Sequence, residues 1–177
     1  MNSRKLAFVT VGVLHEPVGS ERVQGFVDRI PAVYGAADQT PGFVARSFRD
    51  PTTWEHTWGK PILPRCFDYQ IENDRIALTL SLWDDLESVA AFAYAGPHGE
   101  ALTKSKEWFV GHDLPDYAAW WVEDGHTMTF QEGADKVDAL YVNGPTPAAF
   151  NFANPFDVNG EPCRLDRNRV KAKQLAR

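Results

Sequence analysis

The chain has 177 residues, of which 44% are hydrophobic and 12% aromatic, as is typical of one soluble globular domain. Its net charge is −6, and residues 1–163 alone carry 12 basic and 23 acidic side chains, a net charge of −11, which argues against nucleic-acid binding. No apolar run reaches the roughly 18 residues of a membrane span. Two widely separated cysteines, Cys66 and Cys163, predict free thiols in a cytoplasmic protein.

The first half of the chain predicts two strands around a kinked helix. Alternating apolar residues predict a strand over 5–14, and helical spacing predicts a helix over 21–37 that Pro31 kinks. A second strand is expected over 43–49, where Arg46 lies between apolar neighbours. Arg46 is either an arginine at the sheet edge or a group that binds an anionic or carbonyl oxygen of a ligand.

Residues 50–74 show no sustained periodicity and include Trp54 and Trp58. A segment of this length without regular structure predicts an inserted loop. Its tryptophans either anchor the loop on the domain or cover a ligand as a lid.

The third strand is predicted over 76–83 and ends with Trp83. Asp84 and Glu87 have the spacing of a capping box, which predicts a helix that extends to about residue 94. A further helix is expected over 98–109, and on a helical wheel His98 and Trp108 share its inward face. We therefore expect these two side chains to share one site.

The last predicted elements are a strand over 117–122 and a helix from Thr129 to about residue 141. Trp120 and Trp121 point to opposite faces of this strand, and either one can face a pocket. After Phe156 the sequence predicts only loop and a basic tail. The domain is therefore assigned to residues 1–156, with 50–74 as an inserted loop, and the basic tail to 157–177.

This order of elements predicts an α+β fold of the ferredoxin-like, split βαβ type: a four-stranded antiparallel sheet with helices on one face. The second face of the sheet is also apolar, so something must cover it. We expect a homodimer formed through the sheet, as in a dimeric α+β barrel.

Several segments resemble an uncharacterised bacterial family, domain of unknown function 3291, within the dimeric α+β barrel superfamily that includes antibiotic-biosynthesis monooxygenases. The resemblance covers about residues 5–152 and rests on LAFVTVGVL near the start, PGFV from Pro41, LSLWDDLESVAAFAY from Leu80, H-x9-WF from His98, AAWWVEDGH from Ala118 and GPTPAAFNF from Gly144. Residues 50–74 and those after Phe152 look like additions to the family's core. The resemblance implies a ligand between the sheet and its helices.

The superfamily includes cofactor-free monooxygenases, small-molecule isomerases, heme-degrading enzymes and heme-containing aldoxime dehydratases, and the fold does not choose among them. The heme-degrading relatives use an asparagine on strand one, a tryptophan on strand three and a histidine on the next helix. Trp83 and His98 match the last two, but residues 6–14 contain no asparagine. Heme therefore remains an alternative, and no cofactor is the main expectation.

No metal site is expected, because His98, His112 and His126 are each fourteen residues apart, and fourteen helical residues span about 20 Å. The sequence also lacks nucleophile-elbow and phosphate-loop motifs.

We interpret the chain as a protein that binds a hydrophobic small molecule. As an enzyme it would be a cofactor-free monooxygenase, or an isomerase or cyclase, that acts on an aromatic or polyketide-like substrate. His98 would move a proton, and Arg46, Trp83, Trp108 and Trp121 would contact the substrate. A non-catalytic ligand-binding dimer is the remaining alternative.

Overall fold

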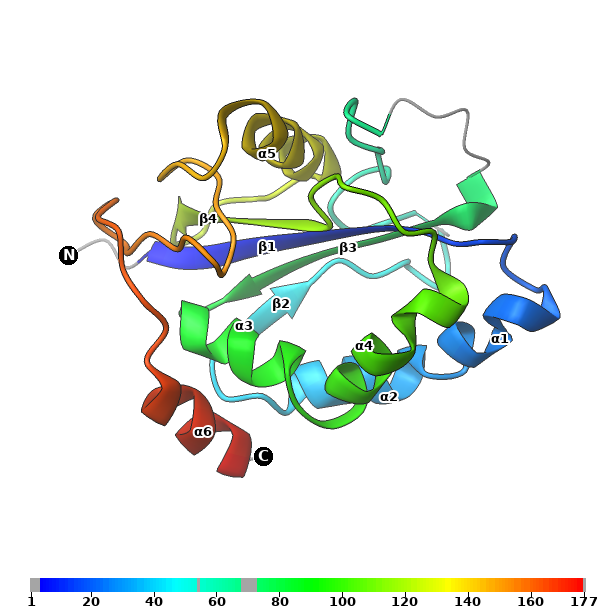
Figure 1. Cartoon of the computed structure of the whole chain (residues 1–177), viewed down its shortest axis with the longest axis horizontal. Coiled ribbons are helices and arrows are strands. Elements are labelled where there is room, and N and C mark those ends of the chain that lie inside the picture. Colours follow the sequence, from blue (N-terminus) through cyan, green and yellow to red (C-terminus); the bar gives the residue numbers. More distant parts are fainter. Residues whose placement is uncertain (1–3, 54, 68–72, 177) are drawn as a thin grey trace.

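The computed structural model describes residues 4–53, 55–67 and 73–176. Its elements, in chain order, are β1 (Arg4–Val13), α1 (Glu21–Val27), α2 (Ile30–Asp38), β2 (Phe43–Arg46), the 3₁₀ helix η1 (Asn73–Arg75), β3 (Ile76–Trp83), α3 (Leu86–Ala93), α4 (Gly96–Trp108), β4 (Tyr117–Glu123), α5 (Phe130–Asn143) and α6 (Arg167–Leu175). The strands form one antiparallel sheet in the order β2-β3-β1-β4 (Figure 1). The predicted α+β, ferredoxin-like arrangement is therefore confirmed.

The helical region after β1 is divided in two, as Pro31 predicts. Helix α1 ends at Val27, and α2 begins at Ile30, so Pro31 lies in the first turn of α2. A proline is tolerated there because the first backbone N–H groups of a helix have no partner within the helix.

The two faces of the sheet are covered by different helices. Helices α1 to α4 lie on one side, the α3/α4 face, and α5 lies on the other, the α5 face (Figure 1). Leu6 and Phe8 of β1 point to the α3/α4 face, whereas Ala7 and Val9 pack in the cluster beneath α5. This alternation follows from the two-residue period of a strand.

Helix α5 covers the face for which the sequence predicts a partner subunit. Gly133 makes this packing close, since a Cβ atom there would lie 3.1 Å from Cγ2 of Val9. The apolar side of α5, with Phe130, Val137 and Leu140, joins the same buried cluster. The helices of this chain therefore lie on both faces of the sheet, and the homodimer remains a prediction about some other surface.

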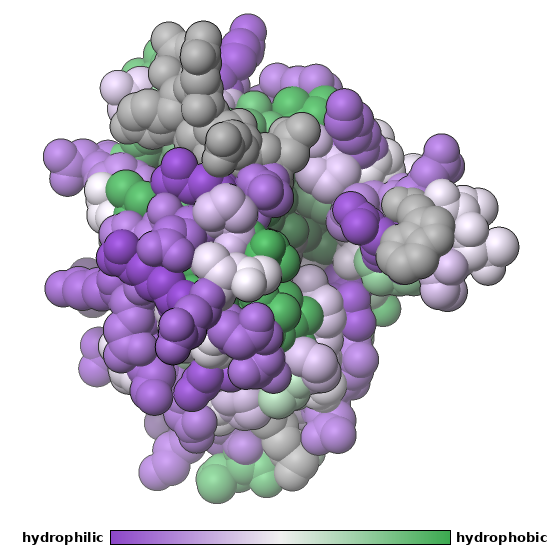
Figure 2. All heavy atoms as spheres, turned by 90° about the vertical axis from the view of Figure 1, so that its right-hand side faces the viewer, coloured by the Kyte–Doolittle hydropathy of each residue, from purple (hydrophilic) through white to green (hydrophobic). Residues whose placement is uncertain are grey.

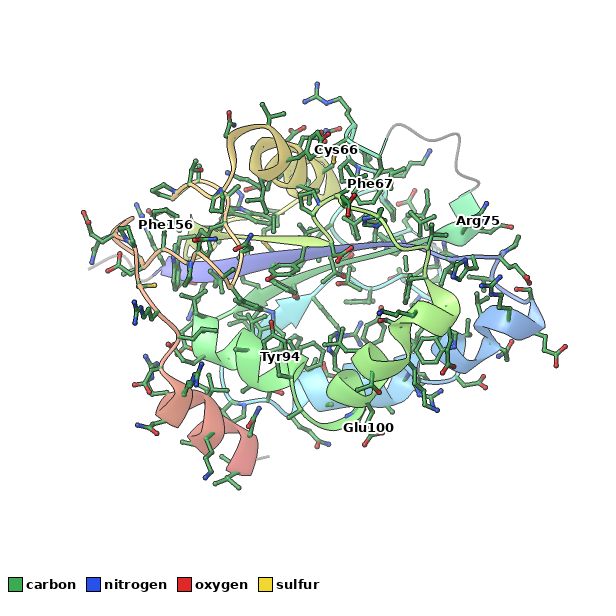
Figure 3. The ribbon with its side chains drawn as sticks, in the orientation of Figure 1. Cys66, Phe67, Arg75, Tyr94, Glu100 and Phe156 are labelled. Carbon is green, nitrogen blue, oxygen red and sulfur yellow. The ribbon has the colours of Figure 1, made fainter. Side chains whose placement is uncertain are left out.

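The described part of the predicted inserted loop is anchored to α5. The backbone N–H groups of Arg65 and Cys66 donate to the carboxylate of Asp138 at 3.1 and 2.8 Å. Trp58 and Phe67 pack against the cluster under α5, and Figure 3 shows Cys66 and Phe67 beside that helix. The anchoring interpretation thus fits Trp58, whereas Trp54 lies outside the described residues.

The N-cap of α3 differs from the predicted one. Asp85, not Asp84, accepts a hydrogen bond from the backbone N–H of Ser88, at 2.8 Å. Asp84 instead pairs with Nζ of Lys5 at 2.7 Å. Both aspartates have a polar residue three positions later, so sequence spacing alone did not distinguish them. By contrast, the predicted N-cap Thr129 does accept from Glu132 N–H.

The chain after Phe156 is ordered, where the sequence predicts only loop and tail. Leu165 and Cys163 pack against the core cluster of the α3/α4 face, and α6 follows against α3. Arg169 holds α6 there through Asp85 at 2.7 Å and Glu87 at 3.4 Å. A helix with no buried residue of its own is held here by tertiary charge pairing, which helical periodicity does not reveal.

Candidate functional site

The middle of the α3/α4 face is incompletely covered. Strand β1 pairs with β3 along most of its length and with β4 as far as Thr10, and its residues Thr10 and Gly12 are both half-buried. Their partners on β3, Thr79 and Ala77, are also half-buried. Because protein interiors are normally close-packed, these four residues, which we call the sheet centre, are only partly covered by the described part of the chain.

Two hydroxyl groups lie together in the sheet centre. The side-chain oxygens of Thr10 and Thr79 are 2.6 Å apart, across the β1–β3 pair. One hydroxyl donates to the other, so the pair retains one proton and further lone pairs for a bound molecule.

An aromatic wall borders the sheet centre on the β4 side. Tyr117, the β4 neighbour of Thr10, packs at 5.4 Å from both Phe8 and Phe152. Its hydroxyl oxygen accepts a hydrogen bond from Phe152 N–H at 3.1 Å. Burial raises the pKa of Tyr117, so the hydroxyl stays protonated at neutral pH. Among the described residues this proton has no acceptor, and it is therefore available to a ligand.

A second aromatic wall borders the other end of the sheet centre. The ring of Phe109 lies so close to β1 that a Cβ atom on Gly12 would be 2.6 Å from its Cε1. Phe26 of α1 meets this ring edge-on at 5.0 Å. Trp108 lies behind them, 3% exposed, and the guanidinium of Arg29 is 5.1 Å from its ring. The absence of a side chain at Gly12 is thus what lets Phe109 approach the sheet.

The structure does not bring His98 and Trp108 together. His98 lies in the first turn of α4 and Trp108 at its last residue, about 15 Å apart along the axis at 1.5 Å per residue. His98 packs against Phe92, with ring centroids 4.6 Å apart. Its Nδ1 lies 2.9 Å from the carbonyl oxygen of Ala93, which can only accept. Nδ1 is therefore the nitrogen that donates to this carbonyl group.

Two of the three tryptophans predicted to line a ligand site, Trp83 and Trp121, lie in or against the core cluster of the α3/α4 face. Trp83 is 1% exposed and donates from Nε1 to Oγ of Ser81 at 2.8 Å. Trp121 donates from Nε1 to the carbonyl oxygen of Phe156 at 2.9 Å. Trp120 points to the α5 face, where its Nε1 donates to Glu132. Of these two neighbours on β4, Trp121 is therefore the one that points to the α3/α4 face. Its indole N–H already donates to a backbone carbonyl group.

Arg46 connects β2 to α2. Its guanidinium lies 3.8 Å from the ring centre of Tyr34, and Nε is 3.7 Å from the carboxylate of Asp38. The stacking and the nearby charge hold the side chain at the edge of the sheet. The edge interpretation therefore describes its position, and a role in ligand binding stays a prediction.

Sequence reasoning missed Thr10, Thr79 and Tyr117. Each was assigned only to a strand, because a polar side chain on an alternating strand is common at a surface. What brings them together is the register of β1 with β3 and β4, and register is not visible in a single sequence.

A separate cavity of about 700 Å³ lies on the other side of β3, between Ile76 and Leu78 and the segment around Pro61. Its lining also carries charges of both signs, from Arg49, Lys60 and Glu55, together with His56. The end of the molecule that carries α1 and the start of β3 is hollowed, with apolar residues inside (Figure 2). Mixed charge favours no single class of ligand at this cavity.

No group of three or more His, Cys, Asp or Glu side chains in the described ranges could hold a metal ion. Neither the described residues nor the comparisons below support the heme alternative. None of the described helices has the length and apolar character to cross a membrane.

No functionally curated protein is detectably similar to this chain. Solved structures with a similar fold include SnoaB, a cofactor-independent oxygenase from Streptomyces nogalater, with 11% identity and a TM-score of 0.40 over 66% of this chain and 90% of that one. A protein of unknown function from Nitrosomonas europaea has 9% identity and a TM-score of 0.42, over 71% and 94% of the two chains. A suggested antibiotic biosynthesis monooxygenase from the same organism has 6% identity and a TM-score of 0.43, over 72% and 96%. These values assign no activity to this chain.

The sequence itself matches a family over most of its length. The match runs from residue 5 to residue 165, so it continues through 50–74 and beyond Phe152, where the resemblance in the sequence was expected to end. The ordered segment between Phe152 and Leu165 therefore falls within the family match. The chain belongs to the family described as domain of unknown function DUF3291.

Proposed function

We propose that this protein binds a hydrophobic small molecule with aromatic or polyketide-like rings at the sheet centre. The observation that carries the proposal is the half-buried Thr10–Thr79 hydroxyl pair in the middle of an otherwise packed sheet face. Ligand sites are typically apolar surfaces with a few polar groups that orient the bound molecule. The walls around Phe109 and Tyr117 would supply the apolar contacts.

The hydroxyl groups define which oxygen atoms a ligand should carry. A protonated Tyr117 can donate to a carbonyl or phenolate oxygen, and the threonine pair can donate once more. Flat rings bearing carbonyl and hydroxyl oxygens fit this combination, because their faces can pack on Phe8 and Phe109.

The proposal extends to catalysis through His98. A histidine acting as a general base can remove a proton from a carbon next to a carbonyl group, and a hydroxyl donor such as Tyr117 can stabilise the enolate oxygen that forms. This proton transfer is the first step of isomerisation or cyclisation, and also of oxygenation without a cofactor. Arg46 would act on a substrate only if it left its stacked position on Tyr34.

Binding is tested by native mass spectrometry of the purified protein and by titration with anthrone, a tricyclic aromatic ketone, followed through tryptophan fluorescence. We expect a one-to-one complex, and Thr79→Val should weaken it at least fivefold, since one net hydrogen bond contributes about 1 kcal/mol. Turnover is then measured with His98→Gln, which should retain binding and lose the reaction.

Tyr141→Phe is the matched control for Tyr117→Phe, because Tyr141 is exposed on α5, beyond the opposite face of the sheet. Thermal unfolding of each variant separates lost binding from lost folding. Equal anthrone affinity in wild type, Thr79→Val and Tyr117→Phe would place the ligand elsewhere and refute the sheet-centre assignment.

A further inference from the structure

The C-terminal part of the chain forms a groove that is distinct from the sheet centre. A cavity of about 1200 Å³ lies between α3, residues 152–165 and α6. Apolar side chains make up much of its lining, among them Ala90, Phe152, Phe156, Leu165 and Val170. Figure 3 labels Tyr94 and Phe156, which contribute to it from the end of α3 and from the C-terminal segment. Its volume exceeds the few hundred cubic ångströms that a small organic ligand requires.

The basic residues of α6 divide between two sides of the helix. Arg169 and Lys173, four residues apart, face α3 and both lie within 3.4 Å of the Asp85 carboxylate. Arg167 and Lys171, also four residues apart, face the groove. Residues at this spacing share one side of a helix, so the pattern separates two anchoring cations from two lining ones.

The cations that line the groove form no ion pair with the described part of the chain. Arg164, Arg167 and Lys171 all line it, and within the described ranges none of them has an ion pair or a side-chain hydrogen bond. Among the described residues, the lining includes no aspartate or glutamate. The chain as a whole has a net charge of −6, so a groove lined only by positive charge contrasts with the rest of the molecule.

An apolar groove lined by three unpaired cations matches a molecule with an apolar body and an anionic end. The geometry points to a binding site for an amphiphilic carboxylate, a small molecule whose apolar chain or ring system ends in a carboxylate group. The apolar part lies on Phe156, Leu165 and Val170, and the carboxylate binds between Arg164 and Arg167. Arginine suits this role because its planar guanidinium can donate two parallel hydrogen bonds to a carboxylate.

This site is independent of the proposal for the sheet centre. Phe152 lines the groove and also packs on Tyr117, but Thr10, Thr79 and Tyr117 are not part of the groove's lining. Substitutions at Thr79 and at Val170 therefore test the two sites separately.

The test is isothermal titration of the full chain with dodecanoate below its micelle concentration, with 1-dodecanol as the uncharged match. We expect one dodecanoate per chain and at least tenfold weaker binding of dodecanol. The double variant Arg167→Gln, Lys171→Gln should weaken dodecanoate binding at least tenfold. Lys104→Gln, Lys106→Gln is the matched control, since it removes the same charge from exposed positions on α4 and should leave the affinity unchanged.

Two further variants locate the bound ligand, and a second anionic ligand distinguishes its chemical class. Val170→Trp fills the groove from α6 and should abolish binding, whereas Thr79→Val should have no effect. The proposal is overturned if dodecanoate does not bind at 1 mM, if it binds equally to both double variants, or if dodecanol binds as tightly. Tighter binding of hexaglutamate than of dodecanoate, lost in the Arg167→Gln, Lys171→Gln variant, would assign the groove to acidic peptides instead.

Discussion

Replacing Gly12 by alanine tests how closely Phe109 packs on the sheet. The new Cβ atom would lie 2.6 Å from Cε1 and 2.8 Å from Cδ1 of that ring. Carbon atoms in good contact are about 3.5–4.0 Å apart, so the ring has to move by about 1 Å. It cannot move freely, because Phe26 meets it edge-on with ring centroids 5.0 Å apart.

The cost of this change follows from two opposing effects. Overpacking of this kind typically destabilises a protein by about 1–3 kcal/mol. Alanine also lowers the conformational entropy of the unfolded chain, which stabilises the folded protein by about 0.4–1 kcal/mol. Gly12 does not have a positive φ, so alanine causes no backbone strain there. We expect a net loss of about 1–2 kcal/mol in the free energy of unfolding. With a urea m-value of about 2 kcal/mol per molar, the midpoint of unfolding falls by about 0.5–1 M.

Gly35→Ala provides the control, since a Cβ atom on this α2 residue would meet nothing within 4 Å. Alanine should stabilise a helix at that position by about 0.5–1 kcal/mol. In a Phe109→Leu background the clash disappears, and Gly12→Ala should then cost less than about 0.5 kcal/mol. If Gly12→Ala leaves the midpoint unchanged, or costs the same in both backgrounds, the ring does not lie on β1 as described.

Three further predictions concern the anchors of the peripheral segments. Burial alone would raise the pKa of Asp138, but hydrogen bonds from Cys66 and Arg65 lower this pKa overall. The ionised carboxylate therefore contributes its full stabilisation above pH 3.8, the ordinary pKa of the group, and this stabilisation is lost as the pH falls through the lower pKa of the folded state. Acid unfolding curves should show this loss in the wild type and not in Asp138→Asn. Burial, reinforced by Asp138, raises the pKa of the Cys66 thiol to about 12. Iodoacetamide at pH 8 should therefore alkylate Cys66 in urea and not in the folded protein, and rapid native labelling would contradict this environment. Asp85→Asn keeps the cap of α3 but removes the charge that holds Arg169, so amide exchange measured by mass spectrometry should accelerate in α6 and stay unchanged in α5.

The order of strands and helices was predictable because each long element has its own periodic signal. The strand over 76–83 was assigned with the bounds that the structure has, since apolar residues alternate along its whole length. Helix α6 carries no such signal, because its contacts are charge pairs with α3 rather than an apolar stripe. Its position depends on residues about eighty positions earlier in the chain, and periodicity reports only on neighbours along one element.

The candidate site was harder to predict than the fold for a related reason. A helical wheel places His98 and Trp108 on one side of α4, but it does not report their separation along the helix axis. The hydroxyl pair of Thr10 and Thr79 depends on strand register, which is set by the folded sheet. Histidine and tryptophan suggest chemistry by their residue type alone, whereas a threonine on an alternating strand does not.

The contrast between the two sheet faces explains where a ligand can bind. On the α5 face, Gly133 brings the helix against Val9, and the side chains beneath it are buried. On the α3/α4 face, Phe109 and Tyr117 stand on either side of residues that solvent still reaches. Since close packing excludes a ligand and a gap in packing admits one, the half-buried hydroxyl pair on the α3/α4 face marks a place where a ligand can reach the sheet. Substitutions that tighten the first face should therefore change stability alone, whereas those at the sheet centre should change ligand binding as well.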